Sequence, residues 1–89
     1  MVSVTRMVLD VLKPHQPNAL DFSQAIAEVD SDYYVHLTVL EVDESTETVE
    51  IVLEANNIDF DAVQLAISDM GGSVHSIDEV EVHNDSDIR

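Results

Sequence analysis

Four stretches of the chain alternate hydrophobic with polar residues, and the two segments between them follow a helical period. The alternating stretches, rich in β-branched residues, are Val2–Lys13, Tyr33–Asp43, Thr48–Ala55 and Ser73–His83. Apolar residues at helical spacing are Leu20, Phe22, Ala25, Ile26 and Val29 in one segment, and Phe60, Val63, Ile67 and Met70 in the other. The pattern therefore predicts the order βαββαβ.

Local signals mark the ends of these elements. Pro14 should end the first strand because proline lacks a backbone donor, and Pro17 or Asn18 suits the start of the first helix. Asp59 is well placed as the N-cap or first-turn acid of the second helix. The Gly71-Gly72 pair should end that helix, because glycine adopts the left-handed backbone conformation without a steric clash.

Two interleaved βαβ halves of this length predict one ferredoxin-like α+β domain over residues 1–84, followed by a polar tail at residues 85–89. Right-handed crossovers give the strand order 4-1-3-2, with two helices on one face of an antiparallel sheet. If Met7, Leu9 and Val11 face the helices, alternation leaves Val8 and Leu12 on the open face with Arg6 and Asp10. Because Val8 and Leu12 are apolar, we expect a neighbouring subunit to cover that face.

Charge narrows the possible partners. The 89 residues hold 19 acidic residues against three Lys and Arg, for a formal net charge of −16, and no cysteine. That balance opposes binding to nucleic acid or to a membrane surface. The hydrophobic content of 45% still favours a folded domain over disorder. We expect a cytoplasmic protein adapted to high salt, in which most carboxylates keep the surface hydrated.

Three runs, "RMVLDVLKPHQP", "NNIDFDAVQLAI" and "GGSVHSIDEVEV", closely resemble the archaeal family known as domain of unknown function 211. The resemblance covers most of the chain and implies a small ferredoxin-like protein without an assigned activity. It also implies assembly into homo-oligomers, including rings, with the helix-free sheet face and the strand edges meeting neighbours.

Lys13, the only lysine, is the first candidate for a functional residue. In one interpretation it forms a structural ion pair with a carboxylate near the start of the fourth strand. In the other, Lys13, His15, Ser73 and His75 form one polar cluster at an end of the sheet that binds a small anion. The second interpretation depends on antiparallel pairing of the first and fourth strands, which brings these residues together.

Asp10 is the second candidate, because it interrupts an apolar run in a predicted central strand. A carboxylate at a subunit junction needs a cation, either from Arg6 or as Ca²⁺ or Mg²⁺. Asp78 and Glu79 on the adjacent strand are further candidate ligands for such an ion. The "DFD" run from Asp59 is interpreted as a helix start rather than as a pair of ligands.

No catalytic motif is recognisable in the sequence: it lacks a cysteine nucleophile, a Gly-rich phosphate loop and a zinc-binding His-Glu-x-x-His helix. The leading hypothesis is a non-enzymatic homo-oligomeric binding or structural module whose assembly involves a divalent cation. The alternative is a sensor that binds a small ligand between subunits. An enzyme that uses His15 or His75 as a general base is the third hypothesis.

Overall fold

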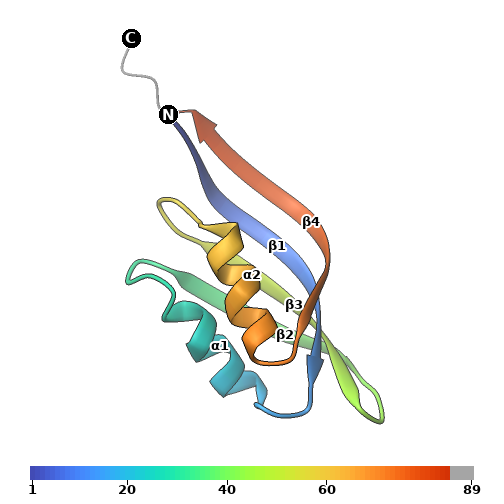
Figure 1. Cartoon of the computed structure of the whole chain (residues 1–89). Coiled ribbons are helices and arrows are strands. Elements are labelled where there is room, and N and C mark those ends of the chain that lie inside the picture. Colours follow the sequence, from blue (N-terminus) through green and yellow to red (C-terminus); the bar gives the residue numbers. More distant parts are fainter. Residues whose placement is uncertain (85–89) are drawn as a thin grey trace.

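The computed structural model describes residues 1–84 and has one four-stranded antiparallel sheet with two helices (Figure 1). Along the chain the elements are β1 (Val2–Pro14), α1 (Ala19–Ala27), β2 (Tyr34–Val42), β3 (Thr46–Glu54), α2 (Phe60–Asp69) and β4 (Ser73–Asn84). The strands lie in the order β2-β3-β1-β4, which confirms the predicted ferredoxin-like α+β fold. The predicted tail at residues 85–89 lies outside the described residues.

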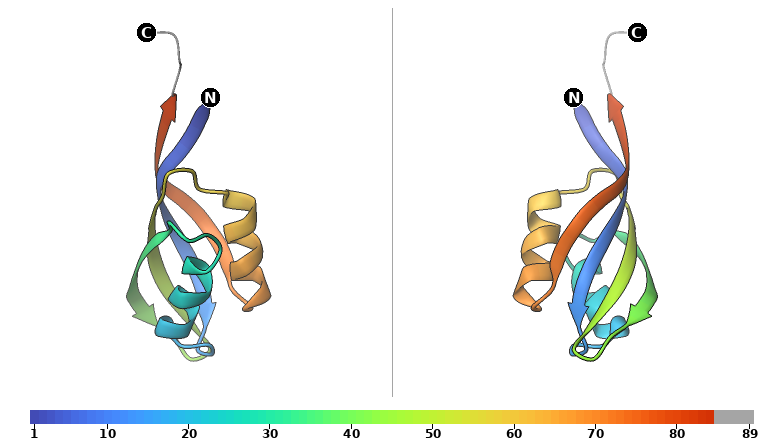
Figure 2. Two further views of the ribbon diagram at one scale, coloured as in Figure 1. Left: turned by 90° about the vertical axis from the view of Figure 1, so that its left-hand side faces the viewer. Right: turned by 90° about the vertical axis from the view of Figure 1, so that its right-hand side faces the viewer.

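Both helices cover the same face of the sheet and leave the other face open (Figure 2). Met7, Leu9 and Val11 of β1 are buried on the helix side, as alternation predicts. They pack with fully buried residues of the helices, such as Phe22 and Ile67. Central strand β1 thus supplies the middle of the core, and its alternate residues form the helix-free face.

The caps follow the sequence signals closely. Asn18 precedes α1 and accepts a hydrogen bond from the Asp21 backbone N–H at 2.9 Å. Asp59 precedes α2 and accepts one from the Ala62 N–H at 3.1 Å, so the predicted N-cap is confirmed. Each side chain satisfies a donor that the first helical turn leaves unpaired.

The glycine pair after α2 has two separate roles. Gly71 has φ of +85°, the left-handed conformation that favours glycine. Gly72 has no room for a side chain, because a Cβ there would lie 3.0 Å from both Ile67 Cγ2 and Phe22 Cζ. The chain therefore turns tightly out of α2 and enters β4 directly against the core.

Beyond the helices, β1 and β4 continue as a two-stranded ribbon (Figure 1). The pairing of β3 with β1 extends only to Arg6, whereas β4 pairs with β1 as far as Val2. A register shift between Val4 and Arg6 in the β1–β4 pairing lies at the same point. No helix within residues 1–84 is long and apolar enough to cross a membrane.

Candidate functional site

Lys13 is completely buried on the helix side of the sheet. Its ammonium donates hydrogen bonds to the carbonyl oxygens of Pro14 at 2.8 Å and Pro17 at 2.7 Å, with the carbonyl of His15 at 3.5 Å. The same nitrogen lies 5.6 Å from the centre of the Phe22 ring. A buried ammonium is tolerated only when it is paired and hydrogen-bonded, and the loop after β1 wraps around Lys13 to provide those partners.

Glu47 of β3 completes this environment. Its Oε1 lies 3.1 Å from Lys13 Nζ, and its Oε2 lies 3.0 Å from His15 Nδ1. The other ring nitrogen of His15, Nε2, is 3.0 Å from the carbonyl oxygen of Glu44. One carboxylate thus joins the strand-to-helix crossing to the β2–β3 hairpin.

These contacts shift two pKa values. The hydrogen bond to Glu47, followed by the one to the Glu44 carbonyl, raises the pKa of His15 above its ordinary value. The hydrogen bonds from His15 and then Lys13 lower the pKa of the Glu47 carboxyl. Both shifts favour the charged forms, so the ion pairs reinforce one another.

The environment of Lys13 supports the structural interpretation of this residue. An ammonium has three donors, and Pro14, Pro17 and Glu47 each provide an acceptor within 3.1 Å. The partner carboxylate comes from β3, which corrects the prediction of one near the start of β4. Lys13 therefore has neither a spare donor nor exposed surface in this structure.

Ser73 and His75 belong to a different surface. Strand alternation directs Lys13 toward the helices, whereas the His75 side chain is 78% exposed and contacts Asp10 on the helix-free face. His75 Nδ1 lies 3.3 Å from Asp10 Oδ2. The structure therefore divides the predicted cluster of Lys13, His15, Ser73 and His75 between two faces, although pairing of β1 with β4 is as expected.

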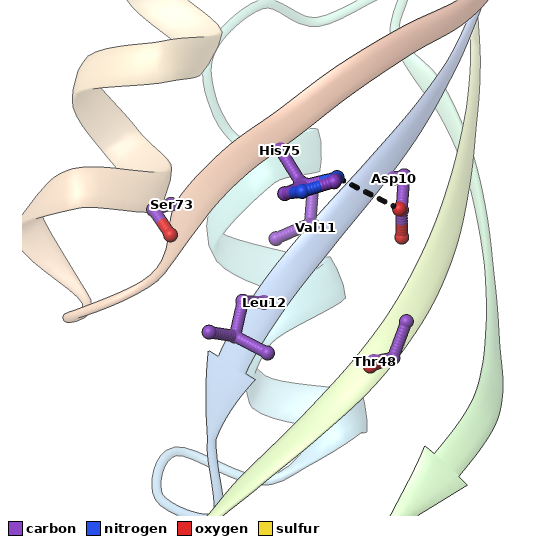
Figure 3. Close-up of a pocket in the computed structure, with 6 residues that line it drawn as sticks. All are labelled: Asp10, Val11, Leu12, Thr48, Ser73 and His75. Atoms are coloured by element: carbon purple, nitrogen blue, oxygen red, sulfur yellow. Dashed lines mark ion pairs between the residues drawn. The ribbon is translucent and has the colours of Figure 1, made fainter.

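A hollow of about 240 Å³ lies on the helix-free face beside Asp10 (Figure 3). Its lining residues come from three neighbouring strands: Asp10, Val11, Leu12, Thr48, Ser73 and His75. In the close-up, one end of the hollow has Leu12 between the two hydroxyl residues Ser73 and Thr48. The opposite end has Asp10 and His75 (Figure 3). The hollow combines an apolar centre with polar side chains around it, as small-molecule sites do.

The carboxylates proposed as metal ligands have separate partners. Asp78 accepts a hydrogen bond from Ser76 Oγ at 2.7 Å. Glu79 pairs with Arg6 Nε at 2.6 Å, and Glu54 pairs with Arg6 Nη1 at 2.8 Å. Arg6 therefore does not pair with Asp10, which corrects the expected Arg6–Asp10 contact.

Within residues 1–84, no three His, Asp or Glu side chains gather where they could hold a metal ion. Asp10, Asp78 and Glu79 consequently have no common point for Ca²⁺ or Mg²⁺ in a single chain. A divalent ion shared between subunits stays a prediction.

Sequence reasoning missed Glu47 and Thr48, both of which lie on β3. The predicted turn included Glu47, but the strand begins earlier, at Thr46. In the observed register Lys13 is opposite Glu47 and Leu12 is opposite Thr48. Counting the β1–β3 pairs from the centre of the sheet would have found both residues.

Comparison with known proteins shows to which family the chain belongs. The model of the domain-of-unknown-function family 211, described as "Uncharacterized ArCR", matches residues 5–85. The chain belongs to this family. It is also 44% identical over 80 residues to the uncharacterized protein MJ0319 of Methanocaldococcus jannaschii, covering 90% of this chain and 82% of that protein. These findings confirm the resemblance and establish a family whose function is uncharacterized.

Proposed function

We propose that the protein is a non-enzymatic module that assembles into a homo-oligomer through the edges of its sheet. The observation that carries this proposal is the exposure of apolar side chains on both edge strands. Leu40 and Val42 of β2 are exposed, and so are Ile77, Val80 and Val82 of β4. An edge strand with free backbone groups and apolar side chains favours pairing with another chain.

The two edges lie on opposite sides of the sheet, since the strand order is β2-β3-β1-β4. Pairing of β2 in one copy with β4 in the next would be a head-to-tail contact. Contacts of this type form rings when the rotation between subunits closes. This geometry is compatible with the rings that the family resemblance implies. It uses only the strand edges, however, and leaves accessible the helix-free face that the same resemblance expects to meet neighbours.

The contacts of the histidines favour a role without catalysis. Both ring nitrogens of His15 have partners, Glu47 Oε2 and the Glu44 carbonyl. A general base needs a free nitrogen within reach of a substrate proton, and His15 does not offer one. His75 is exposed, but its contact with Asp10 does not form part of a nucleophile–base pair within the described chain.

Sedimentation velocity in 2 M KCl tests the assembly. We expect a mass of several times the 9.9 kDa of one chain at micromolar concentrations. Leu40→Asp should shift the protein toward the monomer, because it introduces a charge at the β2 edge. A wild-type mass of a single chain would contradict the proposal.

Leu65→Asp provides a matched control. Leu65 is 62% exposed on α2, and Leu40 is 60% exposed on β2, so the two substitutions are equal in chemistry and in exposure. Only Leu40→Asp should dissociate the oligomer. Dissociation by Leu65→Asp alone would move the interface to the helices. Repeating the wild-type run with EDTA and with CaCl₂ tests whether a divalent cation takes part.

The second candidate is a small-ligand sensor, and the hollow beside Asp10 is the observation that favours it. Of the residues first proposed for ligand binding, Ser73 and His75 line that hollow. A ligand bound there would lie close to β4, the strand that the assembly model places at a subunit contact. Binding of a ligand in the hollow would then change the subunit contact at β4, and this coupling between a ligand site and assembly is what a sensor requires.

A further inference from the structure

We propose that the hollow on the helix-free face binds a small organic ammonium ion, with Asp10 as its counter-ion and Leu12 as the contact for its alkyl part. The proposal concerns a site within one chain, so it does not rest on the oligomeric assembly. The argument begins with the unfilled hydrogen-bonding capacity of the Asp10 carboxylate.

Asp10 Oδ1 is buried and has no hydrogen-bond partner among residues 1–84. The other oxygen, Oδ2, has the contact with His75 Nδ1 at 3.3 Å, a long distance for an N–H···O hydrogen bond. A buried acceptor without a donor is costly, and natural proteins rarely leave one. The carboxylate thus has capacity for a further donor next to the hollow.

Neither the lysine nor the arginine of the described residues can provide that donor. Lys13 is enclosed by its loop and Glu47, and Arg6 is held between Glu54 and Glu79. Asp10 is also opposite Glu50 in the β1–β3 ladder, so a second carboxylate stands beside it on the same face. Adjacent carboxylates and a chain charge of −16 attract a cation from solution.

The hollow gives access to the carboxylate. The Asp10 side chain lines the hollow and is 29% exposed, and the terminal torsion of an aspartate is broad, so a small turn can present the carboxylate to a ligand there. The volume of about 240 Å³ leaves room for a short alkylamine.

The polar lining favours an ammonium over a guanidinium or a metal ion. An ammonium needs only single acceptors, such as one Asp10 oxygen and one of the two hydroxyls, that of Ser73 or that of Thr48. A guanidinium pairs best with both carboxylate oxygens, and Oδ2 is already in contact with His75. A divalent metal ion requires more oxygen ligands than this lining offers, and Leu12 at its centre suits an alkyl chain.

The test is a titration of the ¹⁵N-labelled full-length protein with n-butylammonium chloride at constant total chloride, followed by amide chemical shifts. We expect saturable shifts of residues that line the hollow, with a Kd on the order of 1 mM for so small a ligand. Neutral 1-butanol, methylguanidinium and CaCl₂ should each bind at least five-fold more weakly. Equal binding of 1-butanol would show a purely apolar pocket and overturn the proposal, and so would preferential binding of Ca²⁺ or of methylguanidinium.

Asp10→Asn should weaken butylammonium binding at least ten-fold. Asp78→Asn is the matched control, because it removes the same charge from a carboxylate outside the hollow, and it should change the Kd less than two-fold. If Asp10→Asn does not fold, the double variant Thr48→Val, Ser73→Ala removes the hydroxyl acceptors instead and should weaken binding at least three-fold. Unchanged affinity in the folded variant tested, or no saturable shifts in the wild type, would overturn the proposal.

Discussion

Lys13 and Glu47 are directly opposed in the β1–β3 ladder, and their side chains meet at 3.1 Å where β1 ends. This pair explains why a chain with so little lysine has one at this position. The ammonium replaces water as the donor to the carbonyls of Pro14 and Pro17, which the tight crossing from β1 to α1 turns inward. Lys13 is therefore part of the folded architecture.

Lys13→Met should destabilise the protein by about 3 kcal/mol, because it leaves the inward carbonyls and Glu47 without their donor. The methionine retains most of the apolar stem, so the loss reports the ammonium. Urea denaturation at fixed KCl concentration measures the change. This expectation replaces the one that follows from an exposed ion pair, for which the effect would be small.

Arg6→Met is the matched control for that experiment. It also replaces a cation by methionine. Arg6 loses two short ion pairs, whereas Lys13 loses one ion pair and its bonds to backbone carbonyls, but the partners of Arg6, Glu54 and Glu79, are half exposed. The loss of stability should be clearly smaller than for Lys13→Met. Equal losses would mean that burial of the ammonium has no special role.

Stability should fall as the pH rises from about 6 to 8, because the folded protein raises the pKa of His15 above its ordinary value of 6.5. A raised pKa means that the folded state binds the proton more tightly than the unfolded state. The resulting stabilisation is fully present below pH 6.5 and is lost as the pH passes through the folded-state pKa. Urea denaturation at pH 5.5 and pH 8.5 measures it.

His15→Gln should remove much of this pH dependence, whereas His36→Gln should keep it, since His36 is on exposed strand β2. The lowered pKa of Glu47 acts in the opposite direction and at lower pH. Its stabilisation is present above about pH 4.5 and is lost as the pH falls through the folded-state pKa. If the free energy of unfolding of His15→Gln changed between pH 5.5 and pH 8.5 as much as that of the wild type, the His15–Glu47 contact would be excluded as the cause.

Gly72→Ala should cost about 1–3 kcal/mol through overpacking. The new Cβ would meet Ile67 Cγ2 and Phe22 Cζ at 3.0 Å and the Leu12 carbonyl oxygen at 3.2 Å. Gly71→Ala tests a different cause. A Cβ at Gly71 would lie 3.4 Å from its nearest neighbour, Pro14 Cγ, so there is room for it, but the backbone has φ of +85°. Its backbone strain should cost about 1 kcal/mol.

Thermal unfolding of both glycine variants in the same KCl solution provides the measurement. A near-native melting temperature for Gly72→Ala would show that β4 can move away from the core without loss. The comparison with Gly71→Ala separates lack of space from backbone conformation, because each position carries only one of the two constraints.

The melting temperature should rise with KCl concentration between 0.1 and 2 M. Repulsion among the excess carboxylates is screened as the Debye length shrinks from about 10 Å at 0.1 M to about 3 Å at 1 M. Differential scanning calorimetry across the series gives the trend, and sucrose of equal osmolality controls for general solute effects. A flat series would mean that the acids are balanced within the folded chain.

The fold was predictable because its signals are local. Alternation identified all four strands, and capping residues such as Asn18 and Asp59 marked the helix starts. The exact strand ends are less local. The alternation predicts a start at Thr48 and so places Glu47 in a turn, whereas β3 begins two residues earlier, at Thr46. That small shift concealed the partner of Lys13.

The candidate site was predictable only in part, because it depends on which face each side chain takes. The predicted adjacency of the first and fourth strands is confirmed, and the end of β1 meets the start of β4, where Leu12 is opposite Ser73. Alternation, however, directs Lys13 to the helix side while His75 joins Asp10 on the open side. Register shifts in the β1–β4 pairing, one of them between Asp10 and Val11, depend on long-range packing that the sequence does not display.

Arg6 has a mechanical consequence. Its ion pairs to Glu54 and Glu79 join β3, β1 and β4 where the sheet narrows to the two-stranded ribbon and the register shifts. A sideways force on the ribbon tip passes along β1 and β4 themselves, and this guanidinium adds a side-chain link from both strands to β3. Molar salt weakens such exposed ion pairs. The ribbon would then behave as a lever whose stiffness decreases as the surrounding salt concentration increases.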